Sequence, residues 1–184
     1  MTDLTDGNSH KGVRLPIRIW LSNEDNAELD KIIKYVEDKY GEVFVGMENL
    51  SVIMFDETIK DIKDIVIKGD RVRRGGKYED NGVEKVIKMN PIYFRQDVGE
   101  NIRGIANREF GGFGRELMYQ MGHYLYQVRV RFPKVKHILA NIIVKSIEEH
   151  RDSVYIQNLS DKNWEEIFAQ FCAEQYVNNL DIKF

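Results

Sequence analysis

The stretch that decides how this chain is interpreted is Arg115-Glu-Leu-Met-Tyr-Gln-Met-Gly-His-Tyr-Leu-Tyr-Gln127. Apolar residues recur in it at helical spacing, and no proline interrupts it before Pro133, so it predicts a helix over about 113–130. Four polar or ionisable residues share one face of that helix, at spacings i, i+3, i+4 and i+7: Glu116, Tyr119, Gln120 and His123. We therefore expect one side of the helix to carry a cluster of polar and ionisable side chains that could form a functional site.

The rest of the chain predicts strands first and helices afterwards. A first helix is expected between the cap-like Ser22 and Gly41, because apolar residues follow helical spacing from Leu29 to Tyr40. Strands are predicted for the apolar runs 15–21, 43–45, 50–55, 65–67 and 83–89, the last two as a long hairpin around a basic, glycine-rich connection, 68–82. Residues 92–112 predict loops around a short helical piece, and further helices are predicted at 135–147 and 163–180. A small mixed sheet followed only by helices is an α+β arrangement.

The composition favours one folded domain in a reducing compartment. A chain of 184 residues with 42% hydrophobic residues can bury a core, so we expect a flexible tail at 1–12 and a single domain at 13–184. The formal net charge of −3 gives no reason to expect a nucleic-acid or anionic-membrane partner. Cys172, the single cysteine, excludes an intrachain disulfide, and its apolar surroundings predict a buried thiol. The N-terminal residues lack a signal-peptide core and no apolar stretch reaches the roughly 20 residues of a membrane span, so the predicted location is the cytoplasm or a particle assembled there.

The pentad Tyr119-Gln-Met-Gly-His123 stands where a zinc-binding motif would stand in a peptidase of the H-E-x-x-H type. In that motif two histidines four residues apart bind one zinc ion, and the glutamate beside the first polarises the zinc-bound water. Only the second histidine is kept in this chain. The pentad alone is a weak signal, because a single histidine on a partly apolar helix is most often packed or solvated.

Two further segments strengthen the comparison. Trp164-Glu-Glu-Ile-Phe-Ala-Gln-Phe171 resembles the glutamate-bearing helix of lethal-factor-like zincins, in which the leading glutamate is the third metal ligand; Glu166 matches it. Gly76-Lys-Tyr78 followed by Val86-Ile-Lys-Met89 is similar to the strand at the substrate-facing edge of such domains. The chain thus resembles a zincin-like metallopeptidase domain of the lethal-factor-like or phage metallopeptidase type over residues 43–180. Considered alone, Glu166 fits equally well as a first-turn glutamate next to an Asn163 cap.

The departures from the motif bear on the chemistry. Tyr119 stands at a histidine-ligand position, and Gln120 stands at the general-base position, where an amide cannot take a proton near neutral pH. Loss of a general base alone costs roughly 10²- to 10⁴-fold in rate. His123 and Glu166 are two ligands where catalytic zinc takes three, so no zinc cofactor is expected. The resemblance implies a catalytically inactive zincin-like module with a structural or protein-binding role, and the same resemblance suggests a bacteriophage or virion component. The 83–89 strand would flank the old substrate cleft and accept a partner strand.

Two other functions stay open at this point. An active metal-dependent hydrolase would need an atypical site built on Glu116, His123 and Glu166, although an ideal helix separates the first two by about 10 Å. We favour a polar cluster instead, in which His123 bonds Glu166 directly and Tyr119 and Gln120 lie nearby. A nucleic-acid-associated module would use two basic patches, Arg71, Arg73, Arg74 and Lys77, and Arg129, Arg131, Lys134, Lys136 and His137. Aromatic residues do not interleave with these charges, which weakens a stacking role.

Overall fold

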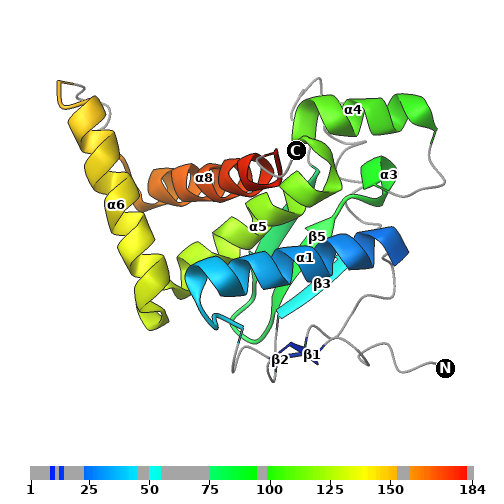
Figure 1. The fold of residues 1–184 in the computed structure, drawn as a ribbon, viewed down its shortest axis with the longest axis horizontal. Helices are drawn as coiled ribbons and strands as arrows, with labels where there is room; N and C mark the ends of the chain where they lie inside the picture. The colour runs from blue at the N-terminus through cyan, green and yellow to red at the C-terminus, as the bar shows by residue number, and fades with distance from the viewer. Residues whose placement is uncertain are drawn as a thin grey trace.

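The structure is a computed structural model of the 184-residue chain, and it describes residues 9–10, 13–14, 23–44, 50–54, 75–94, 99–152 and 158–181. Within these residues the fold is α+β, as predicted (Figure 1). An N-terminal helix comes first, then a mixed sheet, then a series of helices. Of the expected tail, Ser9–His10 (β1) pairs with Val13–Arg14 (β2) in a short antiparallel ladder. The predicted strands 15–21 and 65–67 lie outside the described residues.

The first helix, α1, spans Asn23–Tyr40 and confirms the prediction. Its apolar stripe is fully or almost fully buried, and it comprises Leu29, Ile32, Ile33, Val36 and Tyr40. Gly41 ends the helix with φ of 90°, a conformation that glycine adopts without steric cost, and its N–H bonds the Glu37 carbonyl at 3.1 Å.

Three strands form the main described sheet, in the order β3-β5-β4. Their bounds are β3 Leu50–Met54, β4 Gly76–Asp80 and β5 Lys85–Met89. β3 runs parallel to β5, and β4 runs antiparallel to it, so the sheet is mixed. β5 is therefore central, and β4 is the outermost described strand on its side.

Two of the strand predictions are wrong in detail. The 43–45 run does not begin as a strand: Val43 and Phe44 form a turn. Both side chains are fully buried, and burial rather than strand pairing explains why the run is apolar. The hairpin also has a different first arm. Its connection was expected to include residues 76–80, which instead form β4.

The turn of the β4–β5 hairpin is stabilised by side chains within the turn itself. Asn81 accepts hydrogen bonds through Oδ1 from the N–H groups of Val83 and Glu84, at 2.9 and 2.8 Å. Asp80 accepts one from Gly82 at 2.9 Å, and Gly82 has φ of 86°. Asp-Asn-Gly is typical turn chemistry, so it closes the hairpin here and leaves the preceding residues free to pair.

The C-terminal half is helical. Its helices are α3 Pro91–Phe94, α4 Glu100–Phe110, α5 Gly112–Val128, the 3₁₀ turn η1 Arg129–Arg131, α6 Pro133–Glu149 and α8 Asp161–Asp181. The three long helices predicted in this half are confirmed within a few residues. Pro133 separates α5 from α6 by starting the second helix, where its missing N–H costs nothing.

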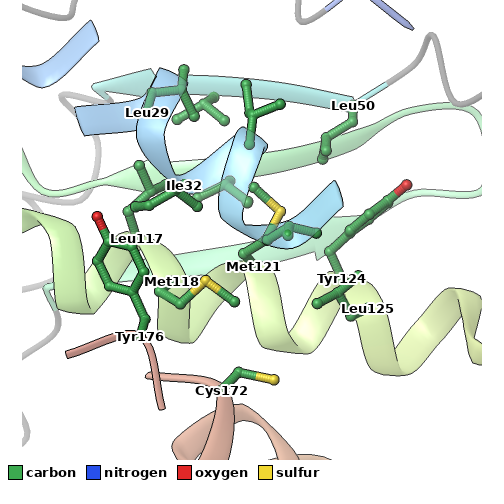
Figure 2. Packing of buried hydrophobic residues seen from close by; sticks show 14 of the residues in the cluster. Leu29, Ile32, Leu50, Leu117, Met118, Met121, Tyr124, Leu125, Cys172 and Tyr176 are labelled. Carbon is green, nitrogen blue, oxygen red and sulfur yellow. The ribbon is translucent and has the colours of Figure 1, made fainter. Parts of the chain in front are cut away.

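α5 runs through the core. α1 and the sheet pack on one side of it and α8 on the other (Figures 1 and 2). Its fully buried side chains include Leu117, Met118, Met121, Tyr124 and Leu125. From α8, the fully buried Cys172 confirms the predicted buried thiol; burial raises its pKa to about 12, and it bonds the Tyr40 hydroxyl at 3.3 Å. No helix in the described part of the chain combines the length and apolarity that a lipid bilayer crossing needs.

Candidate functional site

The site is built on the crossing of α5 and α8. A Cβ placed on Gly122 would lie only 2.7 Å from the Cα of Ala169, so glycine is what lets the two backbones approach this closely. The helices run antiparallel: Arg115 bonds Gln170 at 3.2 Å near one end, and Tyr126 bonds Asp161 at 2.6 Å near the other. This register decides which side chains meet between the two helices.

A cleft of about 780 Å³ opens along this crossing, and we call it the α5–α8 cleft. The start of β4, the end of α4, one face of α5 and the facing side of α8 line it. All the site residues expected from the sequence are among its lining residues: Glu116, Tyr119, Gln120, His123 and Glu166. The tertiary structure therefore places these five residues in one cavity.

Tyr119 and Glu166 bond each other directly. The tyrosine hydroxyl donates to both carboxylate oxygens of Glu166, with 2.5 Å to Oε2, and Gln170 Nε2 donates to Oε2 at 3.3 Å. Burial, and then the hydrogen bond to Glu166, raise the pKa of Tyr119 well above its usual value. The phenol is therefore neutral at physiological pH and acts as a donor.

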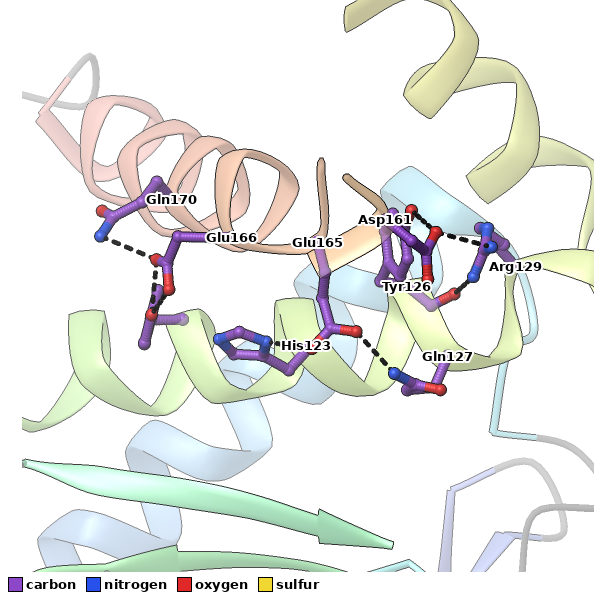
Figure 3. A network of polar contacts seen from close by, with 9 residues as sticks. His123, Tyr126, Gln127, Arg129, Asp161, Glu165, Glu166 and Gln170 are labelled. Atoms are coloured by element: carbon purple, nitrogen blue, oxygen red, sulfur yellow. Dashed lines mark hydrogen bonds and ion pairs between the residues drawn. The ribbon is translucent and has the colours of Figure 1, made fainter. Parts of the chain in front are cut away.

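His123 bonds the neighbouring glutamate, Glu165, not Glu166. Its Nδ1 lies 2.7 Å from Glu165 Oε2, and Gln127 Nε2 donates to the other oxygen of that carboxylate at 2.5 Å (Figure 3). The prediction of a direct His123–Glu166 bond is thus wrong. The crossing register sets Glu165 opposite His123 and Glu166 opposite Tyr119, one helical turn earlier on α5.

Glu116 and Gln120 form the buried part of the cleft wall. Gln120 Nε2 donates to Glu116 Oε2 at 2.6 Å. Gln120 is 4% exposed and Glu116 is 6% exposed. Burial raises the pKa of Glu116 to about 7, although the bond from Gln120 and the charge of Arg115 lower it. Gly75 packs on this carboxyl so closely that a Cβ there would lie 2.9 Å from Glu116 Cγ. Glu116 is therefore poised between its neutral and charged forms at the base of β4.

These side chains do not fit a catalytic zinc ion. A neutral phenol is a poor ligand, and the Glu166 oxygens already accept hydrogen bonds from it. His123 bonds Glu165 through Nδ1, so Nε2 is the one atom that it could offer a metal, and two ligands would still be missing. Among the residues the structure describes, no three His, Cys, Asp or Glu side chains lie close enough together to hold one metal ion. That includes the atypical set of Glu116, His123 and Glu166.

Glu165 is the site residue that sequence reasoning missed. It stands next to the residue that the motif comparison selected, and only the α5–α8 register distinguishes the two glutamates. The predicted cap at Asn163 is also displaced. Ser160 caps α8, accepting from the Asn163 N–H at 3.3 Å, while the Asn163 side chain accepts from the Ser160 N–H at 3.0 Å. Glu166 therefore lies beyond the first turn.

Of the two basic patches, the second lies away from the cleft. Lys77 lines the cleft and pairs with Glu79 at 3.2 Å, while the other residues of the first patch are outside the described part of the chain. The second patch surrounds η1 and the start of α6, and none of its residues lines the cleft. Within it, Arg129 covers the Tyr126 ring at 4.0 Å and approaches Asp161 at 3.5 Å.

No family model, no curated protein and no solved structure matches this chain.

The pairing of Tyr119 with Glu166 can be tested by a double-mutant cycle. Tyr119→Phe and Glu166→Gln are expected to couple by about 1 kcal/mol in free energy of unfolding, because each change removes one side of the same charge-assisted hydrogen bond. Urea unfolding of the four proteins measures it. The matched control replaces Glu165 with Gln in the same cycle, where coupling near zero is expected. A larger coupling to Glu165 than to Glu166 would contradict this geometry.

Proposed function

We propose that this chain is a catalytically inert, zincin-like domain that binds another protein through the α5–α8 cleft. One observation carries the proposal. The three residues at metal-ligand positions, Tyr119, His123 and Glu166, line one cleft, and there the Tyr119 hydroxyl bonds the very carboxylate that would bind the metal. The order of edge strand β4, helix α5, spacer α6 and glutamate-bearing α8 supports the same proposal.

The absence of peptidase activity follows from what these residues can do. Gln120 has no basic atom, and its amide nitrogen is used in the bond to Glu116. Tyr119 keeps its proton because of burial and Glu166. Neither residue can activate a water molecule for attack on a peptide bond, so binding without turnover is the function we assign to the cleft.

The surface we assign to the partner is the side of β4 that faces away from β5. The Asn90 N–H bonds the Gly75 carbonyl and the Asn81 N–H bonds the Glu84 carbonyl, so odd-numbered residues of this arm face β5. The alternation of an antiparallel ladder then turns the backbone N–H and C=O groups of Gly76, Tyr78 and Asp80 outward. No described strand pairs with that side. An extended segment of another protein can add there as a further strand. This corrects the expectation that the 83–89 strand borders the cleft, since β5 is central in the sheet.

The decisive experiment restores the missing ligands. Wild-type protein is expected to purify without stoichiometric zinc and without chelator-sensitive peptide cleavage. The double variant Tyr119→His/Gln120→Glu, which re-creates the motif with His123 and Glu166, is expected to bind about one zinc per chain. Metal analysis and calorimetric titration measure both. The matched control, Tyr119→Phe/Gln120→Glu, adds the glutamate without the ligand and should bind none.

Two results would overturn the proposal. Chelator-sensitive cleavage by the wild type would make the domain an enzyme, and stoichiometric zinc would show that its ligand site is intact. A folded double variant that takes up no zinc would mean that the ligand positions do not converge as in a zincin. For the setting we propose the cytoplasm or a particle assembled there, with a bacteriophage or virion component favoured by the resemblance alone.

A further inference from the structure

A segment that adds to β4, as proposed above, would direct every second side chain into the α5–α8 cleft. The Tyr78 ring packs edge-on against the Tyr124 ring of α5, with 6.2 Å between centroids. Gly76 faces the same helix, since a Cβ there would lie 3.6 Å from Gln120 Cγ. Residues level with each other on neighbouring strands have their side chains on the same face of the sheet. The cleft therefore receives the partner's side chains at the positions level with Gly76 and Tyr78, about 7 Å apart.

Glu165 and Glu166 reach into this part of the cleft from α8 without a lysine or arginine partner (Figure 3). Glu165 bonds His123 and Gln127, and the partners of Glu166 are a tyrosine hydroxyl and a glutamine amide. Among the described residues, no lysine or arginine forms an ion pair with either carboxylate. A carboxylate offers about four lone-pair positions, so each can still accept hydrogen bonds from a cation.

The lining of the cleft carries more acidic than basic groups. Of its three basic residues, Lys77 pairs with Glu79 at 3.2 Å and, by strand alternation, points to the opposite face of the sheet from Tyr78. The other two are Arg115 and Lys162. The acidic residues of the lining are Glu109, Glu116, Glu165 and Glu166. The balance is therefore negative even with Glu116 neutral, which favours a basic ligand.

The Tyr78 hydroxyl is a second polar group that this part of the cleft leaves unsatisfied. Its oxygen is shielded from solvent and has no hydrogen-bond partner among the described residues, whereas buried hydroxyls are normally bonded. Burial, and then the charges of Asp80 and Glu165, raise the pKa of Tyr78 well above its usual value, so the hydroxyl is neutral and lies near both carboxylates. A second hollow, of about 500 Å³, continues toward the hairpin turn, and Tyr78 and Glu165 line both spaces. A cation there can contact the carboxylates and donate to the hydroxyl oxygen.

We propose that the partner segment carries an arginine or a lysine at the position level with Tyr78, and that Glu165 and Glu166 bind its charged group. This inference rests on the proposed strand addition at β4 and names the residue that the cleft selects. Arginine fits best, because its planar group has five donors and can bond two carboxylates and the Tyr78 oxygen together. Existing hydrogen bonds already hold both glutamates in place, so binding costs little side-chain freedom.

Random decapeptides displayed on yeast are the probe, because they impose no sequence on the partner. Selected peptides are synthesised, and hydrogen exchange identifies those that protect the amides of Gly76, Tyr78 and Asp80, as strand addition requires. These peptides are expected to share one arginine or lysine whose replacement by neutral citrulline or glutamine weakens binding by about tenfold or more. Glu165→Gln/Glu166→Gln should weaken the parent peptide by a similar factor and the replaced peptide by less than about twofold.

The matched control is Glu79→Gln/Glu84→Gln, which removes two charges from the same hairpin, where both residues line a separate hollow on the opposite face of the sheet. It should change the affinity by less than about twofold, and circular dichroism should show the wild-type fold for both double variants. Strand-adding peptides that tolerate citrulline or glutamine at every basic position overturn the inference and leave the proposed function standing. So does an affinity that Glu165→Gln/Glu166→Gln leaves unchanged. If no peptide protects the β4 amides, strand addition itself fails and this inference fails with it.

Discussion

Gly122→Ala is expected to destabilise the fold by about 1–3 kcal/mol, although alanine ordinarily favours a helix over glycine by up to about 1 kcal/mol. The reason is the backbone of α8. The added Cβ would lie 2.7 Å from Ala169 Cα and 3.3 Å from the Ala169 carbonyl oxygen, atoms that no side-chain rotation can remove. The two helices must separate, and the buried contacts along the crossing loosen together. Urea unfolding monitored by circular dichroism measures the loss.

Gly104→Ala is the matched control for this prediction. It is also a helix-interior glycine, in α4, but its Cβ would meet only the far end of the Arg108 side chain at 3.3 Å. That end can rotate away, so this variant is expected to gain about 0.5–1 kcal/mol. The two substitutions should therefore have opposite signs. If Gly122→Ala is as stable as the wild type, the close crossing of α5 and α8 is not what fixes the cleft.

Glu116→Gln is expected to stabilise the protein by up to about 3 kcal/mol at pH 8 and to leave it nearly unchanged at pH 4. Burial raises the pKa of Glu116 to about 7 in the folded state, against 4.5 for the free side chain. The folded state holds the proton of Glu116 more tightly than the unfolded state does, so the contribution of this group to the free energy of unfolding is complete below about pH 4.5. This stabilising contribution is lost as the pH rises through 7. Glutamine has the shape of the neutral acid and can keep the bond to Gln120 without the buried charge.

Unfolding free energies at pH 4, 6 and 8 measure this dependence. The control is Glu79→Gln, because hydrogen bonds from Lys88 and Lys77 lower the pKa of Glu79. The ionised Glu79 carboxylate stabilises the fold above the pKa that Glu79 has in the unfolded chain, and this stabilisation is lost as the pH falls through its lower pKa in the folded protein. Glu79→Gln should therefore be destabilising at pH 8, by a smaller amount because the residue is largely exposed, and neutral in acid. A difference for Glu116→Gln that does not grow with pH would mean that its carboxyl is not buried.

Local patterns were sufficient for the fold class and for the helices α1, α5, α6 and α8, but not for residues 92–112, which were expected to be loops around a short helical piece and which hold most of α3 and the 11-residue α4. The apolar spacing of α1 and α5, Gly41 as a stop and Pro133 as a start all act within a few residues, so the sequence shows them directly. The predicted hairpin is misplaced although Asp80-Asn81-Gly82 is a turn signal, because the basic, glycine-rich composition of the preceding residues favours a loop and hides the first strand. The strand prediction for Val43 and Phe44 is wrong for a different reason. Apolar residues indicate burial, and a turn can be buried as deeply as a strand.

By itself, the sequence determined the α+β order and the polar face of α5. Both follow from periodicity within single chain segments. Only the tertiary structure decided which carboxylate each of those residues meets. That depends on how far α8 slides along α5, and the close approach of Gly122 to Ala169 sets it. A shift of one residue between Glu165 and Glu166 is invisible in a helical pattern, yet it assigns one glutamate to His123 and the other to Tyr119. The same packing buries Glu116, whose charge state no local pattern could have revealed.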